Sequence, residues 1–138
     1  FGNVHGVYSP GNVTLKPEIL DHSQKYVSEQ FSLGEKPVDF VFHGGSGSDP
    51  EDIQKGIDYG VVKVNVDTDL QWAYRKGVRD YYDNKREYLQ SQVGNPDGAD
   101  SPNKKHYDPR VWLREAEKQF SGKLIDICNQ LGCMNVIK

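Results

Sequence analysis

The sequence predicts an α/β fold in which parallel strands alternate with helices. Three segments with strand character, residues 1–5, 38–42 and 61–66, are each followed by a segment with the 3.6-residue periodicity of a helix. The third strand segment is almost continuously apolar, which is typical of a strand buried in a parallel sheet. Three strands are too few for an independent doubly wound sheet. The order therefore favours the C-terminal portion of a (β/α)8 TIM barrel, with an additional C-terminal helix.

The first two helices have clear boundaries. Pro17 suits the first turn of a helix that runs to about Gln30, and Gly34 closes that unit. In the next helix, Ser48 or Asp49 is the expected N-cap, and acidic residues follow Pro50 in the first turn, where the helix dipole favours them. Ile53 and Ile57 would face inward, and Gly60 would end this helix.

The rest of the chain is predicted to be helical apart from one loop. Asp67 or Thr68 would cap a long helix whose apolar spacing continues to Leu89. Residues 93–107 are rich in Pro, Gly and polar residues, so we expect a loop that is either functional or disordered. Asp108-Pro109 would then start the last helix. We treat residues 1–138 as part of a single barrel domain.

Composition excludes several classes of protein. A net charge of −3 and a pI near 5.8 argue against a general binder of nucleic acid or of membrane surfaces. The sequence has no apolar run long enough to span a bilayer, and its first residues do not resemble a signal peptide. Cys128 and Cys133 have neither redox nor zinc-site spacing, so we expect reduced thiols in a cytoplasmic protein. Because the sequence starts at Phe1 inside a strand-like segment, we expect it to be part of a longer chain.

Polar residues follow each predicted strand at its carboxyl end, where the strands of a barrel converge on one mouth. Gly6 follows His5, and a glycine- and serine-rich stretch, residues 44–48, follows His43. Two histidines at equivalent strand ends could share a Zn²⁺ ion, or each could be a hydrogen-bonded strand-end residue. His22 and His106 are expected on the solvated surface.

The glycine- and serine-rich stretch offers bare backbone N–H groups near a helix N-terminus. Such a stretch could bind an anion, although it lacks the lysine of a P-loop, or it could be a flexible connection. In "NVDTD" (65–69), helix capping accounts for Asp67, whereas Asn65 could hold a sugar hydroxyl. Lys63 is an alternative nucleophile for Schiff-base chemistry. Arg110 in a first helical turn indicates an anionic partner, either an acidic side chain or a phosphate.

Four segments together resemble a known family: "FGNVHGVY" (1–8), "FVFHGGSGS" (40–48), "YGVVKVNVDTD" (59–69) and "YDPRVWLR" (107–114). They are similar to the C-terminal part of class II, zinc-dependent fructose-bisphosphate aldolases of the dimeric subclass. The resemblance implies that His5 and His43 are zinc ligands and that a monovalent cation, K⁺ or Na⁺, is held nearby. It implies a catalytic role for Asn65 at the hydroxylated carbons of the substrate. The residues that it implies bind substrate or phosphate are Gly6, Gly44, Gly45, Ser46, Asn65, Val66, Asp67, Thr68 and Arg110.

The resemblance also implies the reaction, which is the reversible aldol cleavage of fructose 1,6-bisphosphate in glycolysis and gluconeogenesis. Sugar phosphates would be the ligands, and Arg110 would reach across a homodimer to the second phosphate. Lys63 would then be a barrel-interior residue. The catalytic aspartate, a third metal ligand and the mobile-loop glutamate of the family belong to upstream segments, so we expect these residues alone to be inactive. The alternatives are a tagatose-bisphosphate aldolase and a non-catalytic phosphate-binding or dimerisation fragment.

Overall fold

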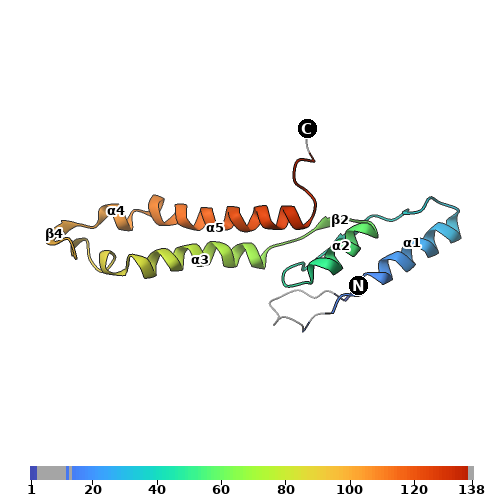
Figure 1. Cartoon of the computed structure of the whole chain (residues 1–138), viewed down its shortest axis with the longest axis horizontal. Coiled ribbons are helices and arrows are strands. Elements are labelled where there is room, and N and C mark those ends of the chain that lie inside the picture. Colours follow the sequence, from blue (N-terminus) through green and yellow to red (C-terminus); the bar gives the residue numbers. More distant parts are fainter. Residues whose placement is uncertain (3–11, 13, 137–138) are drawn as a thin grey trace. The chain divides into compact units, whose positions relative to one another are not determined.

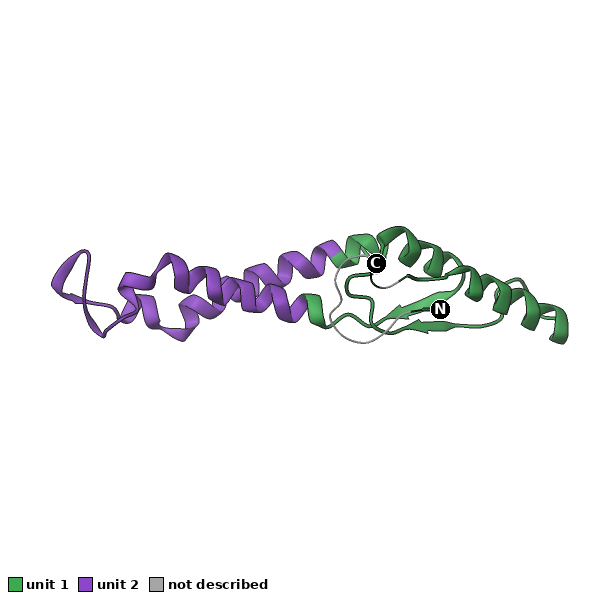
Figure 2. Cartoon of the chain, turned by 90° about the horizontal axis from the view of Figure 1, so that it is seen from below, with its two compact units in different colours: residues 1–69, 127–138 green, residues 70–126 purple. Residues whose placement is uncertain are grey.

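The computed structural model describes residues 1–2, 12 and 14–136. The chain divides into two compact units, one formed by Phe1–Asp69 with Ile127–Lys138 and the other by Leu70–Asp126 (Figure 2). Of the predicted first strand, residues 1–5, residues 3–5 lie outside the described residues, and residues 1–2 are not assigned to a strand. Both cysteines are free thiols, as predicted. Among the described residues, no helix combines the length and apolar character needed to cross a membrane.

The first unit has the predicted alternation of helices and parallel strands (Figure 1). Its elements are α1 (Glu18–Phe31), β1 (Phe40–Phe42), α2 (Pro50–Asp58) and β2 (Val61–Val64). The two strands pair in parallel, with Phe42 opposite Val64. The α/β class is therefore confirmed, although both strands are shorter than predicted.

Local signals set where the two helices of this unit begin. Pro17 directly precedes α1, and the side chain of Asp49 caps α2 by accepting a hydrogen bond from the Glu51 N–H at 2.8 Å. Apolar residues from the helices and strands form the core of the unit. They are Leu15, Leu20, Phe42, Ile53 and Val61.

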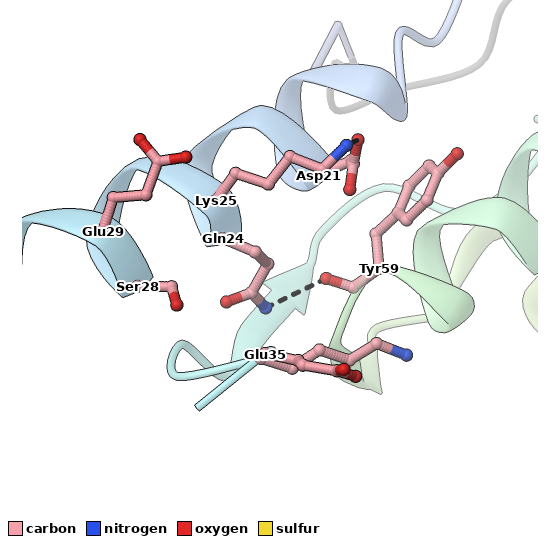
Figure 3. Close-up of a pocket in the computed structure, with 8 residues that line it drawn as sticks. Asp21, Gln24, Lys25, Ser28, Glu29, Glu35 and Tyr59 are labelled. Atoms are coloured by element: carbon pink, nitrogen blue, oxygen red, sulfur yellow. Dashed lines mark hydrogen bonds and ion pairs between the residues drawn. The ribbon is translucent and has the colours of Figure 1, made fainter. Parts of the chain in front are cut away.

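A buried amide side chain connects three segments of the first unit. Gln24 on α1 is only 3% exposed, and its Nε2 donates to the Val38 carbonyl oxygen at 2.7 Å. The same Nε2 donates to the Tyr59 carbonyl oxygen at 3.0 Å (Figure 3). Its Oε1 accepts the Val38 N–H at 2.9 Å. The neighbouring Gly60 has a φ of +105°, and a Cβ there would lie 2.4 Å from the Gln24 Nε2. Glycine is therefore required at position 60 both by the backbone conformation and by the space.

One expectation for the strands is wrong in this chain. Val62 is 65% exposed and Lys63 is also exposed, whereas the apolar run predicted a strand buried on both faces. The reason is that the sheet has only two strands among the described residues, so much of the β2 surface has no layer against it. Lys63 is exposed in this chain, and its place in the interior of a complete barrel stays a prediction.

The second unit is built from helices and a small hairpin. After α3 (Thr68–Asn84) come the 3-10 helix η1 (Arg86–Tyr88), β3 (Val93–Asn95), β4 (Gly98–Pro102), α4 (Lys104–Tyr107) and α5 (Pro109–Gln130). The third helix therefore ends before Leu89, whereas α5 starts where the sequence predicted. The two long helices approach closely at Gly77, where a Cβ would lie 2.7 Å from the Ala116 Cα.

Residues 93–107 were predicted to be a loop, and this prediction is wrong. They form an antiparallel hairpin and a short helix around Asn103, which has no exposed surface. The Asn103 Nδ2 donates to the carbonyl oxygens of Ser91 at 2.9 Å and Gly94 at 3.0 Å, and its Oδ1 accepts from the Asn95 Nδ2 at 2.6 Å. One buried amide therefore satisfies backbone groups of a segment whose composition alone indicates a loop.

His106 is also not the solvated residue that the sequence predicted. Its ring packs against Tyr88 with centroids 4.5 Å apart, and its Nε2 is buried without a hydrogen-bond partner among the described residues. Burial lowers the pKa of His106, and the charges of Lys105 and Lys85 lower it further. His22, in contrast, is exposed as predicted.

Candidate active site

The carboxyl ends of β1 and β2 bring two predicted site segments together. Because the strands are parallel and Phe42 lies opposite Val64, the chain leaves both strands at the same edge, at His43 and Asn65. The Asn65 N–H continues the ladder by donating to the Phe42 carbonyl at 2.8 Å. The parallel pairing therefore brings the two segments to the same edge of the strand pair.

The side chains of His43 and Asn65 contact each other at this edge. The Asn65 Nδ2 and the His43 Nδ1 are 2.9 Å apart. If the amide nitrogen donates, Nδ1 is the acceptor and Nε2 carries the ring proton. A metal on Nε2 would need the other tautomer, in which Nδ1–H donates to the amide oxygen of Asn65 after the amide turns over. Since either arrangement keeps a hydrogen bond, this pair fits an imidazole metal ligand oriented by an amide.

The glycine-rich segment owes part of its composition to close packing. Gly44 and Gly47 have φ values of +68° and +77°, which favour glycine. Gly45 is buried, and a Cβ there would lie 3.1 Å from the Val64 Cγ1. The Gly45 N–H donates to the Asn65 carbonyl at 3.4 Å. The segment is therefore shaped to lie against the end of β2.

The two segments line an open cavity of about 680 Å³. Ser46 reaches across the segments, since its hydroxyl oxygen accepts the Asp69 N–H at 3.4 Å at the start of α3. Apart from Val64, every residue lining the cavity was predicted as a site residue from the sequence. The lining residues are Gly44, Ser46, Val64, Asn65, Val66, Asp67 and Thr68.

Arg110 belongs to the second unit and lies at the start of α5. Its Nε donates to the Asp108 Oδ1 at 3.0 Å and its Nη2 to the Asp108 Oδ2 at 2.5 Å. Arg110 is 87% exposed at its side chain and Asp108 only 17%. These bonds lower the pKa of Asp108 to about 2. An acidic side chain is one of the two anionic partners that the sequence predicts for Arg110. The sequence alone does not identify which acidic residue it is. The signal for Asp108 was its place directly before Pro109.

Two predicted site residues, His5 and Gly6, lie outside the described residues. Within the part of the chain that the structure describes, no three His, Cys, Asp or Glu residues are grouped as a metal site would require. The described portion therefore contains His43 as one metal-ligand candidate and not a complete set of ligands.

Comparison with known proteins identifies the family. A family profile described as fructose-bisphosphate aldolase class-II matches residues 1–136. The chain belongs to the class II fructose-bisphosphate aldolase family. This confirms the resemblance seen in the sequence, and the family is one of lyases that are generally metal-dependent.

Relatives of this aldolase chain come from bacteria and fungi. Fructose-bisphosphate aldolase from Campylobacter jejuni is 57% identical over 136 residues, which are 98% of this chain and 38% of the relative. The Neurospora crassa fructose-bisphosphate aldolase is 62% identical over 125 residues, 90% of this chain and 34% of the relative. The chain thus spans little more than a third of the length of these curated relatives.

Solved structures agree with the sequence relatives. The crystal structure of the Campylobacter jejuni aldolase has a TM-score of 0.90, with 57% identity over 98% of this chain and 39% of that one. The YdjI aldolase from Escherichia coli has a TM-score of 0.62 with 20% identity, covering 94% of this chain and 39% of the other. At that identity, the second likeness shows the fold alone.

Proposed function

We propose that these residues are the C-terminal part of a (β/α)8 aldolase that cleaves fructose 1,6-bisphosphate reversibly into dihydroxyacetone phosphate and glyceraldehyde 3-phosphate. The observation that carries the proposal is the cavity at the ends of β1 and β2. It is lined by the glycine-rich segment and by residues 64–68, and His43 lies beside it. The upstream strands and the remaining catalytic groups would come from residues outside these 138.

His43 and His5 are the residues that would hold a Zn²⁺ ion. When bound, such an ion acts as a Lewis acid that polarises the substrate ketone and stabilises the charge that develops on proton removal. His43 suits this role because its imidazole is exposed and its Nδ1 is within hydrogen-bond distance of the Asn65 amide. A monovalent cation, K⁺ or Na⁺, would lie near the glycine-rich segment.

The cavity residues would bind and orient the substrate. Gly44, Gly45 and Ser46 would hold a phosphate group, together with Gly6. Asp67 and Thr68 would lie at the same end of the substrate, where the start of α3 favours an anion. Holding the phosphate in this way fixes the reacting carbons, and a misplacement of these atoms is costly in rate.

Asn65 would contact the hydroxyl groups of the substrate next to the reacting carbons, and Val66 would form part of the same wall. An amide suits this position because it can both donate and accept hydrogen bonds. Its contact with His43 would connect the metal ligand to the bound substrate through one amide group.

Arg110 would bind the second phosphate of the substrate in the neighbouring protomer of a homodimer. Its guanidinium is highly exposed and carries donors suited to phosphate. We place this dimeric enzyme in the cytoplasm, with sugar phosphates as its only proposed ligands besides metal ions.

The test is the activity and metal content of the full-length enzyme with Asn65→Ala. We expect kcat for fructose 1,6-bisphosphate cleavage to fall about 100-fold, the scale of a misplaced reacting group. The matched control Asn84→Ala, at an exposed position on α3, should keep wild-type activity. Bound zinc, measured by elemental analysis, should be present in both proteins.

Four outcomes would contradict the proposal, the last being the trapping of substrate on Lys63. One is wild-type turnover in Asn65→Ala, and another is turnover that survives complete removal of metal by a chelator. The third is a higher rate on tagatose 1,6-bisphosphate, which would make this a tagatose-bisphosphate aldolase. Covalent trapping of substrate on Lys63 by borohydride would instead indicate Schiff-base chemistry.

A further inference from the structure

We propose that Asp108 is a positioning residue that holds the Arg110 guanidinium with its outer edge presented to a phosphate. The proposal rests on the function proposed above for Arg110. Asp108 itself would not touch the substrate and would act only through Arg110.

Asp108 binds one particular edge of the guanidinium. The carboxylate binds side-on, to Nε at 3.0 Å and to Nη2 at 2.5 Å. A guanidinium has five N–H donors, so this pairing uses two and leaves three on Nη1 and Nη2. One N–H of each Nη lies along the end of the group, and this edge can make a bidentate contact with two phosphate oxygens.

The two partners differ in exposure and in restraint. Asp108 is 17% exposed, and Arg110 is 87% exposed. The Asp108 N–H donates to the Lys104 carbonyl at 3.0 Å, and the Asp108 carbonyl accepts the Val111 N–H at 2.9 Å. Its Oδ1 also accepts the Arg110 N–H at 3.0 Å, as expected of a helix N-cap. A restrained carboxylate therefore holds a highly exposed side chain.

The segment before Asp108 is itself anchored. The carbonyl of the fully buried Asn103 accepts the His106 N–H at 2.8 Å, and the Tyr81 hydroxyl donates to the His106 carbonyl at 2.7 Å. The first bond closes the first turn of α4 on its N-cap residue Asn103, and the second ties α4 to α3. The Asp108 carboxylate thus extends from a fixed part of the second unit.

Two opposing effects set the direction of the expected change in phosphate binding. Fixing Arg110 in advance lowers the conformational entropy lost when it binds phosphate, which favours binding. A carboxylate beside Arg110 also reduces its net charge, which opposes binding. The Asp108 carboxylate, with a pKa of about 2, is ionised in the neutral range as any Asp would be, so both effects operate. A rise in KM on removing Asp108 would therefore show that fixing Arg110 in advance is the larger effect. A fall in KM would show that the reduced net charge is the larger effect.

The test is steady-state kinetics of the full-length, metal-loaded enzyme with Asp108→Ser. Serine keeps a side-chain oxygen that can cap α5 but loses the two-point contact with Arg110. We expect KM for fructose 1,6-bisphosphate to rise about tenfold, the scale of one lost charge-assisted hydrogen bond. We also expect kcat to change little and KM for fructose 1-phosphate, which lacks the second phosphate, to stay unchanged.

Two further variants separate the contact with Arg110 from a general loss of charge and from a loss of stability. Glu117→Ser removes an exposed ion pair with Arg114 on the same helix and should leave both KM values at the wild-type level. Asp108→Asn keeps the shape and one acceptor oxygen, so its KM should lie between those of wild type and Asp108→Ser. It also serves as the test variant if Asp108→Ser melts at a much lower temperature.

Arg110→Ala separates failure of the positioning role from failure of the proposed function. If Arg110→Ala does not raise KM for the bisphosphate, the function proposed for Arg110 fails, and the positioning role fails with it. If Arg110→Ala raises KM but removing Asp108 leaves KM unchanged or lowers it, only the positioning role is overturned. If Asp108 acts through Arg110, adding Asp108→Ser to Arg110→Ala should cause no further rise.

Discussion

Both compact units are held by a buried amide side chain, but the two amides connect segments over different sequence distances. Asn103 in the second unit bonds to groups 8, 9 and 12 residues away. Gln24 in the first unit bonds to groups 14 and 35 residues away. The two residues have similar burial, and each donates to two backbone carbonyls, so the difference lies mainly in which segments each one joins.

This difference shows which part of the chain is structurally complete by itself. The three side-chain hydrogen bonds of Asn103 are all made within a short stretch of chain. The strand pair of the first unit leaves Val41 47% exposed and Val62 65% exposed, even though Gln24 connects α1 to the segments beside the strands. A parallel pair of strands normally has both faces covered, so this part needs neighbours that the hairpin does not need.

The largest expected loss of stability comes from removing Asn103, the amide that joins nearby segments. Asn103→Ala removes the amide that donates to the Ser91 and Gly94 carbonyls and accepts from the Asn95 amide in a partly buried place, and leaves the Gly94 carbonyl with the Ser91 hydroxyl at 3.3 Å as its side-chain donor. We expect the free energy of unfolding, measured by urea denaturation of the full-length protein, to fall by about 3 kcal/mol. Asn84→Ala, at an exposed position, should change it by less than about 0.5 kcal/mol.

Hydrogen exchange would locate the effect of this substitution. We expect Asn103→Ala to increase amide exchange most strongly in residues 91–107, because all three side-chain bonds of Asn103 are made within that stretch. Unchanged protection of these amides would show that the hairpin does not depend on Asn103.

A smaller loss of stability is expected when Gln24, the amide that joins distant segments, is displaced. Gly60→Ala places a Cβ 2.4 Å from the Gln24 Nε2 and 3.1 Å from the Val38 carbonyl oxygen, at a φ of +105°. We expect a loss of about 2 kcal/mol in the free energy of unfolding, since a positive φ and a displaced buried amide both cost stability.

Gly34→Ala is the matched control in the same unit. A Cβ at Gly34 has no atom within 4 Å, so the substitution should be neutral or slightly stabilising. If Gly34→Ala and Gly60→Ala melted at the same temperature, the Gln24 connection would not contribute to stability.

The smallest expected effect is a pH dependence from His106. Burial, Lys105 and Lys85 lower its pKa, and Asp97 opposes them, so the folded state favours the neutral ring. Between the lowered pKa and the ordinary value near 6.5, the unfolded chain binds more protons. Stability should therefore be fully present above about pH 6.5 and be lost as the pH falls through the lowered pKa.

The measurement is the free energy of unfolding at several pH values for wild type and His106→Gln. The wild type should lose more stability than the variant between about pH 7 and pH 5. Equal slopes for the two proteins would contradict a buried neutral His106.

Several features could be predicted from the sequence because their causes are local. Pro17, the cap at Asp49 and the Asp108-Pro109 helix start act within one helical turn, and the structure confirms where these helices begin. The proximity of the strand ends at His43 and Asn65 could be predicted because parallel pairing places equivalent strand ends at one edge. The roles of His5 and Gly6 stay predictions.

Other features depended on contacts that no local pattern encodes. The composition of residues 93–107 predicts a loop, and only the burial of Asn103 accounts for a hairpin there. The sequence places Asp108 before a helix but does not reveal that its carboxylate holds Arg110 side-on. The apolar run of β2 predicts burial, which depends on neighbouring layers and not on the run itself.

The α/β class, the helix starts, the family and the residues around the cavity could thus be read from the amino-acid sequence. These follow from periodicity, capping and motifs that lie close together along the chain. Only the folded chain reveals how two buried amides, Gln24 and Asn103, satisfy distant backbone groups and how Arg110 is held. The physical reason is that a buried hydrogen bond forms only when folding brings its donor and acceptor together and removes water from both.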